Sequence, residues 1–401
     1  MPSALPAGPE GQKSRGAEKP VPTVYVGRCP SYEQTGVEAT IRQAVDALGG
    51  IAHFVQPGQR VMLKPNLLLS TPPETAINTH PTVVGAVARL VAEAGARVLI
   101  ADSPGGGARH NPASLRQLYR ISGLDQVAEA TGAELNLDCE ALEVPYPEGG
   151  LIKRLDVMRP ATTVDAIINL PKLKTHGLLR YTGAVKNLFG LVPGRVKLGY
   201  HTKLQGTDHF SQMLLDLALW ARPVLTIMDA IVAMEGEGPS AGRPRQLGLL
   251  LAGSDTTAVD LAALDIIGMD PQTVPTIRVA QRRGLTTGQS ADLEVLGTAL
   301  AEARVADLYA PQTGSAEVML TPPGLKRWLE RQLVASPRAG PRCTGCGVCA
   351  DNCPAEAITI ENRRARMDLS TCIRCYCCHE LCPQHAIELK RSPLARLLTR
   401  I

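Results

Sequence analysis

The sequence lacks any run of about eighteen consecutive apolar residues, the length that a membrane-spanning helix needs. Its first twenty residues are polar and rich in proline and glycine, without the apolar stretch of a secretory signal peptide. These absences predict a cytoplasmic chain with no membrane span and with a disordered arm over residues 1–20. The apolar share is 44%, which is enough for a sizeable buried core.

Cysteine is almost missing from the first 342 residues, where only Cys29 and Cys139 occur. The chain has 11 cysteines, and the other nine all fall between Cys343 and Cys382. A disulfide scaffold would not be confined to so short a part of a long chain. The crowding therefore predicts metal binding in a reducing compartment.

The cysteine-rich segment contains one spacing twice. The pattern Cys-x2-Cys-x2-Cys-x3-Cys-Pro begins at Cys343 and again at Cys372, and it is the spacing of bacterial ferredoxins with two [4Fe-4S] clusters. In that pattern the fourth cysteine of each run binds the other cluster. The expected ligands are Cys343, Cys346, Cys349 and Cys382 for one cluster, and Cys372, Cys375, Cys378 and Cys353 for the other.

Two details of this segment leave alternatives open. Cys377 is a ninth cysteine lying between expected ligands, and we interpret it as a bystander thiol at the cluster edge. A pair of zinc sites is the other interpretation of the cysteines, because C-x2-C pairs also bind zinc. The uneven, repeated spacing with proline after each fourth cysteine favours iron–sulfur clusters.

The formal net charge of +4 at pH 7 counts every cysteine as neutral. Each oxidised [4Fe-4S] cluster with its four thiolates carries about −2, so two clusters bring the net charge to about 0. The charge balance therefore gives no reason to expect a nucleic-acid partner.

Short β-branched runs alternate with amphipathic helical patterns from about residue 21 onward, which is typical of a largely parallel sheet. We expect strands over residues 21–27, 60–64, 96–102, 164–170, 224–230 and 246–253, and helices over 81–95 and 256–268. The predicted fold is a doubly wound α/β domain over 21–320, a helix and linker over 321–340, and a small α+β dicluster ferredoxin-like domain over 341–391.

Polar groups follow several of the expected strands, and ligands of open α/β sheets bind beyond the carboxyl ends of the strands. The candidates for a catalytic crevice are Lys64, Asp102, Lys172, Lys174 and His176. An extended chain places Lys172, Lys174 and His176 on one face, whereas a helix would still bring Lys172 near His176. Such a group suits a carboxylate or phosphate, although a basic surface edge is the plainer interpretation. The glycines after Asp102 match neither a dinucleotide fingerprint nor a P-loop.

Several longer stretches carry a family resemblance. They are KPNLL at Lys64, THP at Thr79, DSPGG at Asp102, NLPKLKTH at Asn169, GAVKNLFGLVPG at Gly183, MDAIVAMEGEGP at Met228 and AGSDTTAVD at Ala252. Over about residues 20–320 the chain resembles the bacterial and archaeal family called domain of unknown function 362, many members of which carry a C-terminal ferredoxin module. The resemblance implies a shared fold and pocket but no assigned reaction.

The residues that match the family motifs are Lys64, Asn66, His80, Asp102, Ser103, Lys172, Lys174, His176, Lys186, Asn187, Asp229 and Glu235. Lys186 stands in an apolar run, where an unpaired amine is costly, so it needs a bound anion or a carboxylate partner. We expect Asp102, Asp229 or Glu235 to be that partner.

These patterns lead to three hypotheses about function. The first is a reductase-type enzyme that relays electrons through two [4Fe-4S] clusters to a small anionic substrate in the Lys/His/Asp crevice. The second is a non-catalytic ferredoxin-like carrier or assembly subunit that docks on a redox partner protein. The third is a non-redox ligand-binding or lyase-like domain whose clusters serve structure or iron sensing.

Overall fold

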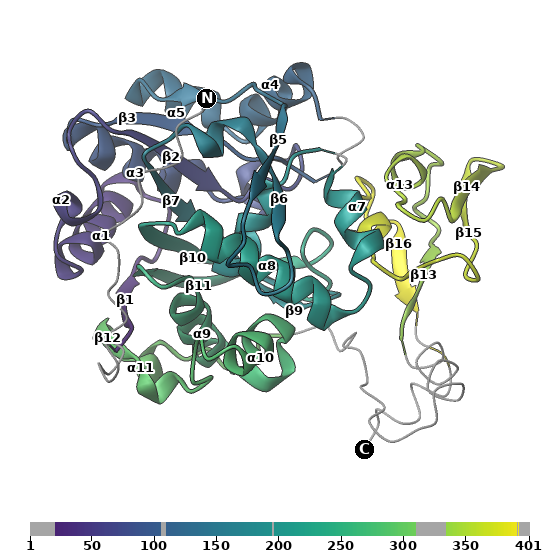
Figure 1. The fold of residues 1–401 in the computed structure, drawn as a ribbon. Helices are drawn as coiled ribbons and strands as arrows, with labels where there is room; N and C mark the ends of the chain where they lie inside the picture. Colours follow the sequence, from purple (N-terminus) through teal and green to yellow (C-terminus); the bar gives the residue numbers. More distant parts are fainter. Residues whose placement is uncertain (1–20, 106–109, 195, 310–333, 391, 393–401) are drawn as a thin grey trace.

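The computed structural model describes residues 21–105, 110–194, 196–309, 334–390 and 392. The arm expected over residues 1–20 lies outside these ranges, as does most of the segment 321–340 in which we expected a helix and a linker. Figure 1 shows a large domain that ends near residue 309 and a smaller domain built from the last described residues.

A mixed sheet of ten strands runs through the described part of the large domain. The strands follow the order β12-β1-β11-β10-β7-β2-β3-β4, while β8 pairs with β10 and β9 pairs with β8. Their bounds are β1 (Thr23–Arg28), β2 (Arg60–Pro65), β3 (Arg97–Ile100), β4 (Glu134–Leu135), β7 (Ala166–Leu170), β8 (Lys172–His176), β9 (Arg180–Thr182), β10 (Leu225–Glu235), β11 (Arg243–Gly253) and β12 (Glu294–Gly297).

Most neighbouring strands are parallel, including β2 with β3 and β7, and β7 with β10. The exceptions are β11, which is antiparallel to β1 and β10, and β9, which is antiparallel to β8. A largely parallel sheet is therefore confirmed, and the expected strands are present within a few residues of their predicted bounds.

Helices cover both faces of the sheet, so consecutive residues of its strands enter different cores. Leu63 of β2 and Ile168 of β7 join one core, whereas Met62 and Ile167 join another. The first core includes side chains of α1 (Gln34–Ala47), α3 (Pro81–Glu93), α4 (Pro112–Ile121) and α5 (Leu124–Thr131). The opposite face is covered by α8 (Thr207–Ala221), α9 (Thr256–Ile266) and α10 (Pro275–Arg282). This two-sided burial explains the near-continuous apolar strands and confirms the doubly wound α/β fold.

The two predicted helices begin at side-chain caps. His80 Nδ1 accepts from the backbone N–H of Thr82, and Pro81 occupies the first turn of α3, where no N–H is needed. The carboxylate of Asp255 accepts from the N–H groups of Thr257 and Ala258 at the start of α9. Shorter elements complete the domain: α2 (Ile51–Phe54), the hairpin β5 (Ala141–Pro145) and β6 (Arg154–Met158), α6 (Ala184–Asn187), α7 (Val196–Lys203) and α11 (Leu300–Ala303).

The small domain consists of two strand pairs and two short helices. Its elements are β13 (Ser336–Ala339), α13 (Val348–Asp351), β14 (Ile358–Glu361), β15 (Arg364–Met367), α14 (Cys377–Glu380) and β16 (Ile387–Lys390). Strand β13 pairs with β16, so residues 336–339, which we expected in the linker, are part of this domain. The local Ser-Pro-Arg sequence gave no sign of that strand, because its partner lies about fifty residues later.

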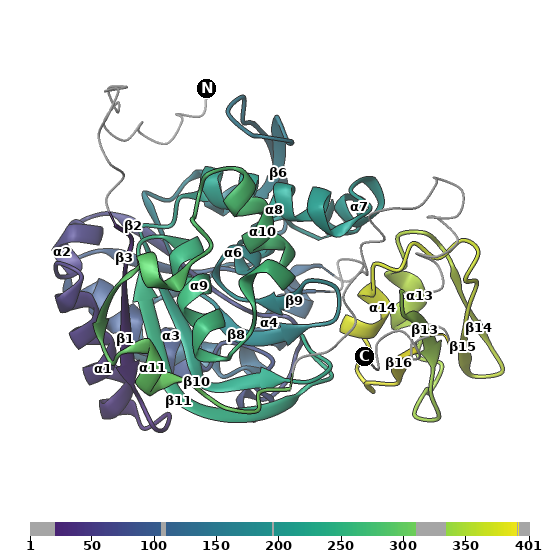
Figure 2. The same ribbon diagram turned by 90° about the horizontal axis from the view of Figure 1, so that it is seen from below.

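The small domain packs against the large domain beside α7, with α14 on the near side and β14–β15 farthest away (Figures 1 and 2). Ser240 Oγ donates to the Glu380 carbonyl at 2.7 Å, and Thr202 Oγ1 donates to the Pro354 carbonyl at 3.4 Å. His379 Nε2 lies 3.2 Å from the Glu237 carbonyl oxygen. Side chains from both domains can therefore contribute to one site.

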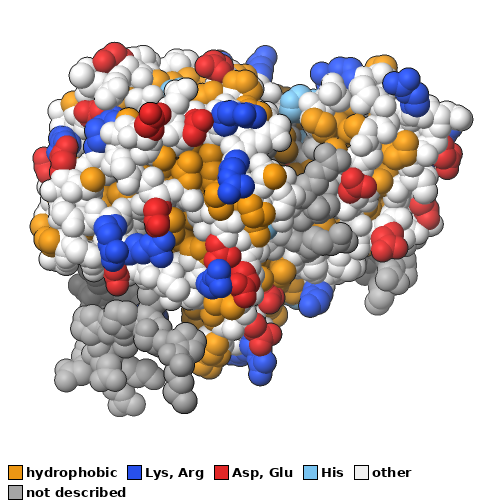
Figure 3. Space-filling view, turned by 90° about the horizontal axis from the view of Figure 1, so that it is seen from above, with side chains coloured by type: hydrophobic (Ala, Val, Ile, Leu, Met, Phe, Trp, Pro, Cys, Tyr) orange, Lys and Arg blue, Asp and Glu red, His pale blue; other side chains and the backbone are white. Residues whose placement is uncertain are grey.

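Two further features concern the charges on the surface and the length of the helices. On the face shown in Figure 3, Lys and Arg side chains are interspersed with Asp and Glu side chains over the visible described residues. Within the ranges that the structure describes, no helix is both long enough and apolar enough to cross a membrane.

Candidate functional site

The two cysteine runs fold into two adjacent pockets. One pocket is lined by Cys343, Cys346, Cys349 and Cys382, together with the glycines of the first loop. The other is lined by Cys353, Cys372, Cys375 and Cys378. Each pocket therefore gathers three cysteines of one run and the fourth cysteine of the other, which is the grouping that the sequence spacing predicts.

Backbone N–H groups point at cysteine sulfurs in both pockets. Ala357 N donates to Cys353 Sγ and Ala386 N donates to Cys382 Sγ, each at 3.2 Å. Similar contacts of 3.4 Å reach Cys343 Sγ from Ala365 N and Cys372 Sγ from Arg374 N. Hydrogen bonds to ligand sulfurs are among the features that set the reduction potential of an iron–sulfur cluster, so the residues present fit such a group.

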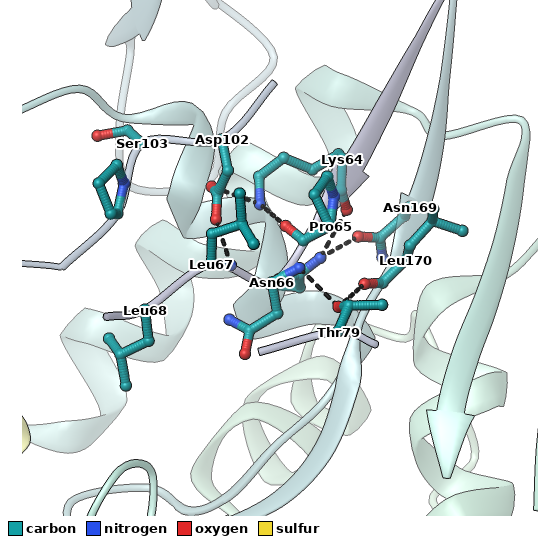
Figure 4. A network of polar contacts seen from close by, with 12 residues as sticks. Lys64, Pro65, Asn66, Leu67, Leu68, Thr79, Asp102, Ser103, Asn169 and Leu170 are labelled. Carbon is teal, nitrogen blue, oxygen red and sulfur yellow. Dashed lines mark hydrogen bonds and ion pairs between the residues drawn. The ribbon is translucent and has the colours of Figure 1, made fainter. Parts of the chain in front are cut away.

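Lys64 and Asp102 form a buried ion pair where β2 and β3 end side by side. Lys64 Nζ lies 2.7 Å from Asp102 Oδ1 and donates to the Pro65 carbonyl at 2.8 Å, while Asp102 Oδ2 accepts from Leu67 N at 2.7 Å (Figure 4). Neither side chain is more than 3% exposed. Gly190 is required beside the pair, because a Cβ there would lie 1.9 Å from Asp102 Oδ1. The sequence placed both residues at strand ends, and the structure shows that they neutralise each other.

Asn66 follows the ion pair in the chain and joins the same network through its backbone. Its backbone N–H donates to Thr79 Oγ1 at 2.8 Å, and Thr79 Oγ1 donates to the Leu170 carbonyl at 2.7 Å. Figure 4 shows the side-chain amide of Asn66 pointing away from these contacts. Its Oδ1 atom is buried and has no hydrogen-bond partner within the described part of the chain.

Lys172 and Asp229 form a second buried ion pair, with 2.8 Å between Nζ and Oδ2. Tyr32 joins it, since its hydroxyl donates to Asp229 Oδ1 at 2.8 Å and accepts from Lys172 Nζ at 2.7 Å. The ring of Tyr32 stacks on His80 with 3.6 Å between centroids, and His80 N donates to Asp229 Oδ2 at 3.0 Å. Lys172 is thus already paired with groups of the protein itself.

A cavity of about 90 Å³ lies between the two domains. The large domain lines it with Asn66, Asp102, Lys174, Lys186, Lys197 and His201, and with apolar side chains that include Leu68, Phe189 and Leu198. The small domain contributes Cys377, Glu380 and Leu381, all at or next to α14. Cys377 also lines the pocket of Cys353, Cys372, Cys375 and Cys378, so one side chain separates that cysteine pocket from the cavity.

Three ammonium groups border this cavity. Lys174 Nζ donates to the Ile77 carbonyl at 2.8 Å, and Lys197 Nζ donates to the carbonyl groups of Ser103 and Pro104. Lys186 is half-buried, and no hydrogen bond or ion pair joins it to another described residue. Burial lowers the pKa of all three, and the charge of Lys186 lowers the pKa of Lys174 and Lys197 further. The cavity therefore concentrates positive charge that its own walls leave only partly compensated.

The pKa of Lys197 falls to about 7, chiefly because of burial. The carboxylate of Asp102 opposes that shift, whereas Lys64 and Lys186 add to it. The same surroundings lower the pKa of His201 to about 3, since burial, Lys186 and Lys197 all disfavour its charged form. His201 is therefore a neutral ring, and it stacks on Phe210 with 4.5 Å between centroids.

The position of Lys186 is fixed by the start of α6. Asp260 accepts from Ala184 N at 2.5 Å, Val185 N at 3.0 Å and the Tyr181 hydroxyl at 2.9 Å. Gly183 allows this close approach, because a Cβ there would lie 2.2 Å from Asp260 Oδ1. The short helix that carries Lys186 is consequently anchored to α9 by a buried carboxylate, whose pKa burial raises to about 6.

His176 connects β8 to the small domain. Its Nδ1 accepts from Leu178 N at 3.0 Å and Leu179 N at 3.3 Å, so the ring proton is on Nε2. That atom lies 3.2 Å from Glu380 Oε1. Burial and the charges of Lys186 and Lys174 hold the pKa of His176 well below its ordinary value. His176 is therefore a neutral ring whose Nε2 faces a carboxylate of the other domain without a hydrogen bond to it.

The structure brings together only part of the crevice that we expected from the sequence. Of the five candidates, Lys174 and Asp102 line the cavity, while Lys64, Lys172 and His176 are buried behind it with protein partners. The carboxylates expected near Lys186 are engaged elsewhere: Asp102 with Lys64, Asp229 with Lys172, and Glu235 with Arg243 at 2.7 Å. The acidic residue whose charge acts on Lys186 is Glu380.

Sequence reasoning missed Lys197, His201 and Glu380 and treated Cys377 as a bystander. Lys197 and His201 lie four residues apart on α7, which does not follow any of the predicted strands. Glu380 lies between two expected cluster ligands, so the cysteine pattern drew attention away from it. The local sequence offered one clue to the role of Glu380, which is that an acidic residue occurs within the cysteine-rich segment.

Known proteins are similar to both parts of the chain. The family model described as Domain of unknown function (DUF362) matches residues 61–265, and that of a 4Fe-4S dicluster domain matches residues 342–386. A thylakoid-associated protein of Synechocystis sp. is 40% identical over 268 residues, which cover 66% of this chain and 80% of that protein. One component of an ion-translocating oxidoreductase complex of Methanosarcina acetivorans is 44% identical over 48 residues, covering 12% of this chain and 18% of that component.

Among solved structures, the lactate racemase apoprotein of Thermoanaerobacterium thermosaccharolyticum aligns with a TM-score of 0.38 and 13% identity. That alignment covers 59% of this chain and 54% of the racemase, so the chain spans about half of the racemase's length. The family model and the Synechocystis relative establish the family directly. The chain belongs to the family described as Domain of unknown function (DUF362), and it carries a 4Fe-4S dicluster domain after the family domain.

Proposed function

We propose that the protein holds two [4Fe-4S] clusters and is a reductase-type enzyme, which passes electrons from them to a small molecule bound in the interdomain cavity. Cys343, Cys346, Cys349 and Cys382 would hold one cluster, and Cys353, Cys372, Cys375 and Cys378 the other. The clusters supply one-electron transfer at low potential. The observation that carries the proposal is the position of Cys377, which lines both the second cysteine pocket and the cavity.

The arrangement of the cysteines favours clusters over mononuclear zinc. A zinc ion with bonds of about 2.3 Å to sulfur draws its four thiolates towards one point. Among the described residues, no three His, Cys, Asp or Glu side chains are grouped closely enough to hold a single metal ion. The cysteines instead line two pockets, four of the expected ligands in each, which suits clusters whose thiolates bind separate iron atoms.

The two cysteine sets differ in their relation to the rest of the protein. Cys346 of the first set is exposed, and no residue of its pocket also lines the cavity. The second set adjoins the cavity through Cys377. This arrangement suits a path in which electrons enter the first cluster from a redox partner protein. They then leave the second cluster for the cavity. In this scheme Lys174, Lys186 and Lys197 bind the acceptor, and His176 and Glu380 hold the domains in register.

Anaerobic reconstitution of the full chain tests the cofactor part, and about eight iron and eight sulfide ions per chain are expected. A colourless protein with stoichiometric zinc would contradict it. The catalytic part is tested by reducing the reconstituted protein and recording its reoxidation by fractions of a metabolite extract. We expect one fraction to reoxidise the wild type and the exposed-site control Lys203→Met, but not Lys186→Met.

Equal reoxidation of wild type, Lys186→Met and Lys203→Met would instead favour the second candidate function, a ferredoxin-like carrier that exchanges electrons at its surface. The exposed Cys346 is the observation that keeps this candidate in consideration. In that case the cavity would be a structural joint between the domains, and only a partner protein would accept electrons from the second cluster.

A further inference from the structure

We infer that the interdomain cavity binds a small organic carboxylate, with Lys186 as the anchor of the carboxylate group and the side chains around Leu198 enclosing its apolar part. This inference rests on the proposed function, because it names the class of molecule that the same cavity takes. It concerns binding only and requires no electron transfer.

The charge of the lining favours an anion. Asp102 is neutralised by Lys64 at 2.7 Å, so it does not offset the other cations of the cavity. Glu380 is then the carboxylate left to balance Lys174, Lys186 and Lys197. Glu380 Oε1 lies 3.2 Å from His176 Nε2. No hydrogen bond or ion pair joins Lys186 to another described residue. Lys186 is half-buried and lines the cavity, so a bound anion can form a charge-assisted hydrogen bond with its ammonium group.

The mixed polar and apolar lining of the cavity favours an organic anion over a mineral one. Lys174, Lys186 and Lys197 supply the cationic groups. Leu68, Phe189, Leu198, Pro239 and Leu381 supply apolar surface. An inorganic phosphate would leave that apolar surface unused, whereas a short aliphatic acid contacts it while its carboxylate meets the lysines.

The volume limits the size of the acid. A buried water molecule needs about 10–15 Å³ of such space, so a cavity of about 90 Å³ holds roughly six to nine water molecules or an organic anion with about as many non-hydrogen atoms. Acids the size of acetate or butyrate fit this limit, and octanoate exceeds it.

The test is isothermal titration calorimetry of the oxidised, cluster-loaded full chain with acetate, butyrate, octanoate, butyramide and inorganic phosphate. We expect one butyrate per chain, weaker acetate binding, and no measurable binding of octanoate or the neutral butyramide. Loss of a charge-assisted hydrogen bond predicts about ten- to a hundredfold weaker butyrate binding in Lys186→Met. The control Lys203→Met, at an exposed position of α7, should bind butyrate as the wild type does.

A second variant guards against misfolding of the first. Leu198→Phe keeps every charge and enlarges an apolar side chain of the lining, so it should weaken butyrate binding more than acetate binding at unchanged iron content. The inference is overturned if no carboxylate binds the wild type, if phosphate binds better than butyrate, or if Lys186→Met binds butyrate like the wild type. The calorimetry uses no reductant, so it tests carboxylate binding alone. Electron transfer from the second cluster to the cavity is tested separately, by redox titration.

Discussion

Replacing Lys172 by methionine separates a structural role for this residue from the ligand-binding role that its sequence context suggested. Lys172 is 1% exposed and Asp229 is fully buried, with 2.8 Å between their charged atoms. Methionine retains the apolar stem of the side chain but removes the ammonium group. Asp229 then keeps its hydrogen bonds from Tyr32 and from the backbone of His80 and Ile231, yet loses its only counter-charge in the described network.

Removal of one partner from a buried ion pair typically costs about 3–5 kcal/mol, because the remaining charge stays buried without compensation. At about 2–4 °C per kcal/mol for a domain of this size, the melting temperature of the large domain should fall by about 6–20 °C. Lys203→Met removes an exposed lysine and should change stability by no more than about 0.5 kcal/mol.

Thermal unfolding followed by far-ultraviolet circular dichroism measures this difference, and calorimetric titration with butyrate at a temperature where both variants are folded measures binding. We expect Lys172→Met to be much less stable than wild type but to bind butyrate within about threefold of it. A variant with wild-type stability and strongly weakened binding would refute the reasoning and return Lys172 to the binding site.

Three other perturbations probe the cysteine sets, the buried ion pair and the cavity. Cys353→Ala should abolish the cluster anchored at Cys372 and leave the other cluster in place. The spin integral of the reduced protein in electron paramagnetic resonance should then fall by about half. Loss of the first cluster alone would show that the ligand sets are wrong. Gly190→Ala places a Cβ 1.9 Å from Asp102 Oδ1. The free energy of unfolding, measured in urea, should therefore fall by about 1–3 kcal/mol or more. An unchanged free energy of unfolding would contradict the close approach of Gly190 to Asp102. Butyrate affinity should be constant below pH 7, where Lys197 is charged, and should fall by up to about tenfold per pH unit above pH 7. Titration calorimetry between pH 6 and 9 should show that affinity depends less on pH in Lys197→Met than in the wild type. Identical profiles for the two proteins would exclude Lys197 from the site.

The fold and the cysteine sets were accessible from the sequence because both depend on regular spacing. The apolar runs that form β2, β7 and β10 are buried on both faces, and that burial is visible as an unbroken apolar pattern. The cysteine pattern repeats within forty residues and predicts which cysteines gather around each of the two pockets. The strand β13 was not accessible, since its sequence gives no local preference and its partner is distant.

The candidate site was only partly predictable, because charge pairing is a property of the folded chain. The strand ends correctly predicted that Lys64 and Asp102 are neighbours. They did not predict that the two side chains form an ion pair with each other at 2.7 Å. Lys174 and Lys172 lie on one strand, two residues apart, yet one borders the cavity and the other pairs with Asp229. Glu380 reaches the cavity through the packing of two domains, which no local pattern encodes.

The most direct test of the account is a redox titration of the two clusters, followed by electron paramagnetic resonance, in wild type, Lys186→Met and Lys203→Met. Lys186 borders the cavity beside Cys377, so removing its charge should disfavour the reduced state of the second cluster, identified as the one lost in Cys353→Ala. We predict that its midpoint potential falls by an amount on the order of tens of millivolts in Lys186→Met, while the first cluster and the Lys203→Met control keep wild-type potentials. An equal shift of both clusters, a shift of the first cluster alone, or no shift would contradict the placement of the second cluster next to the cavity.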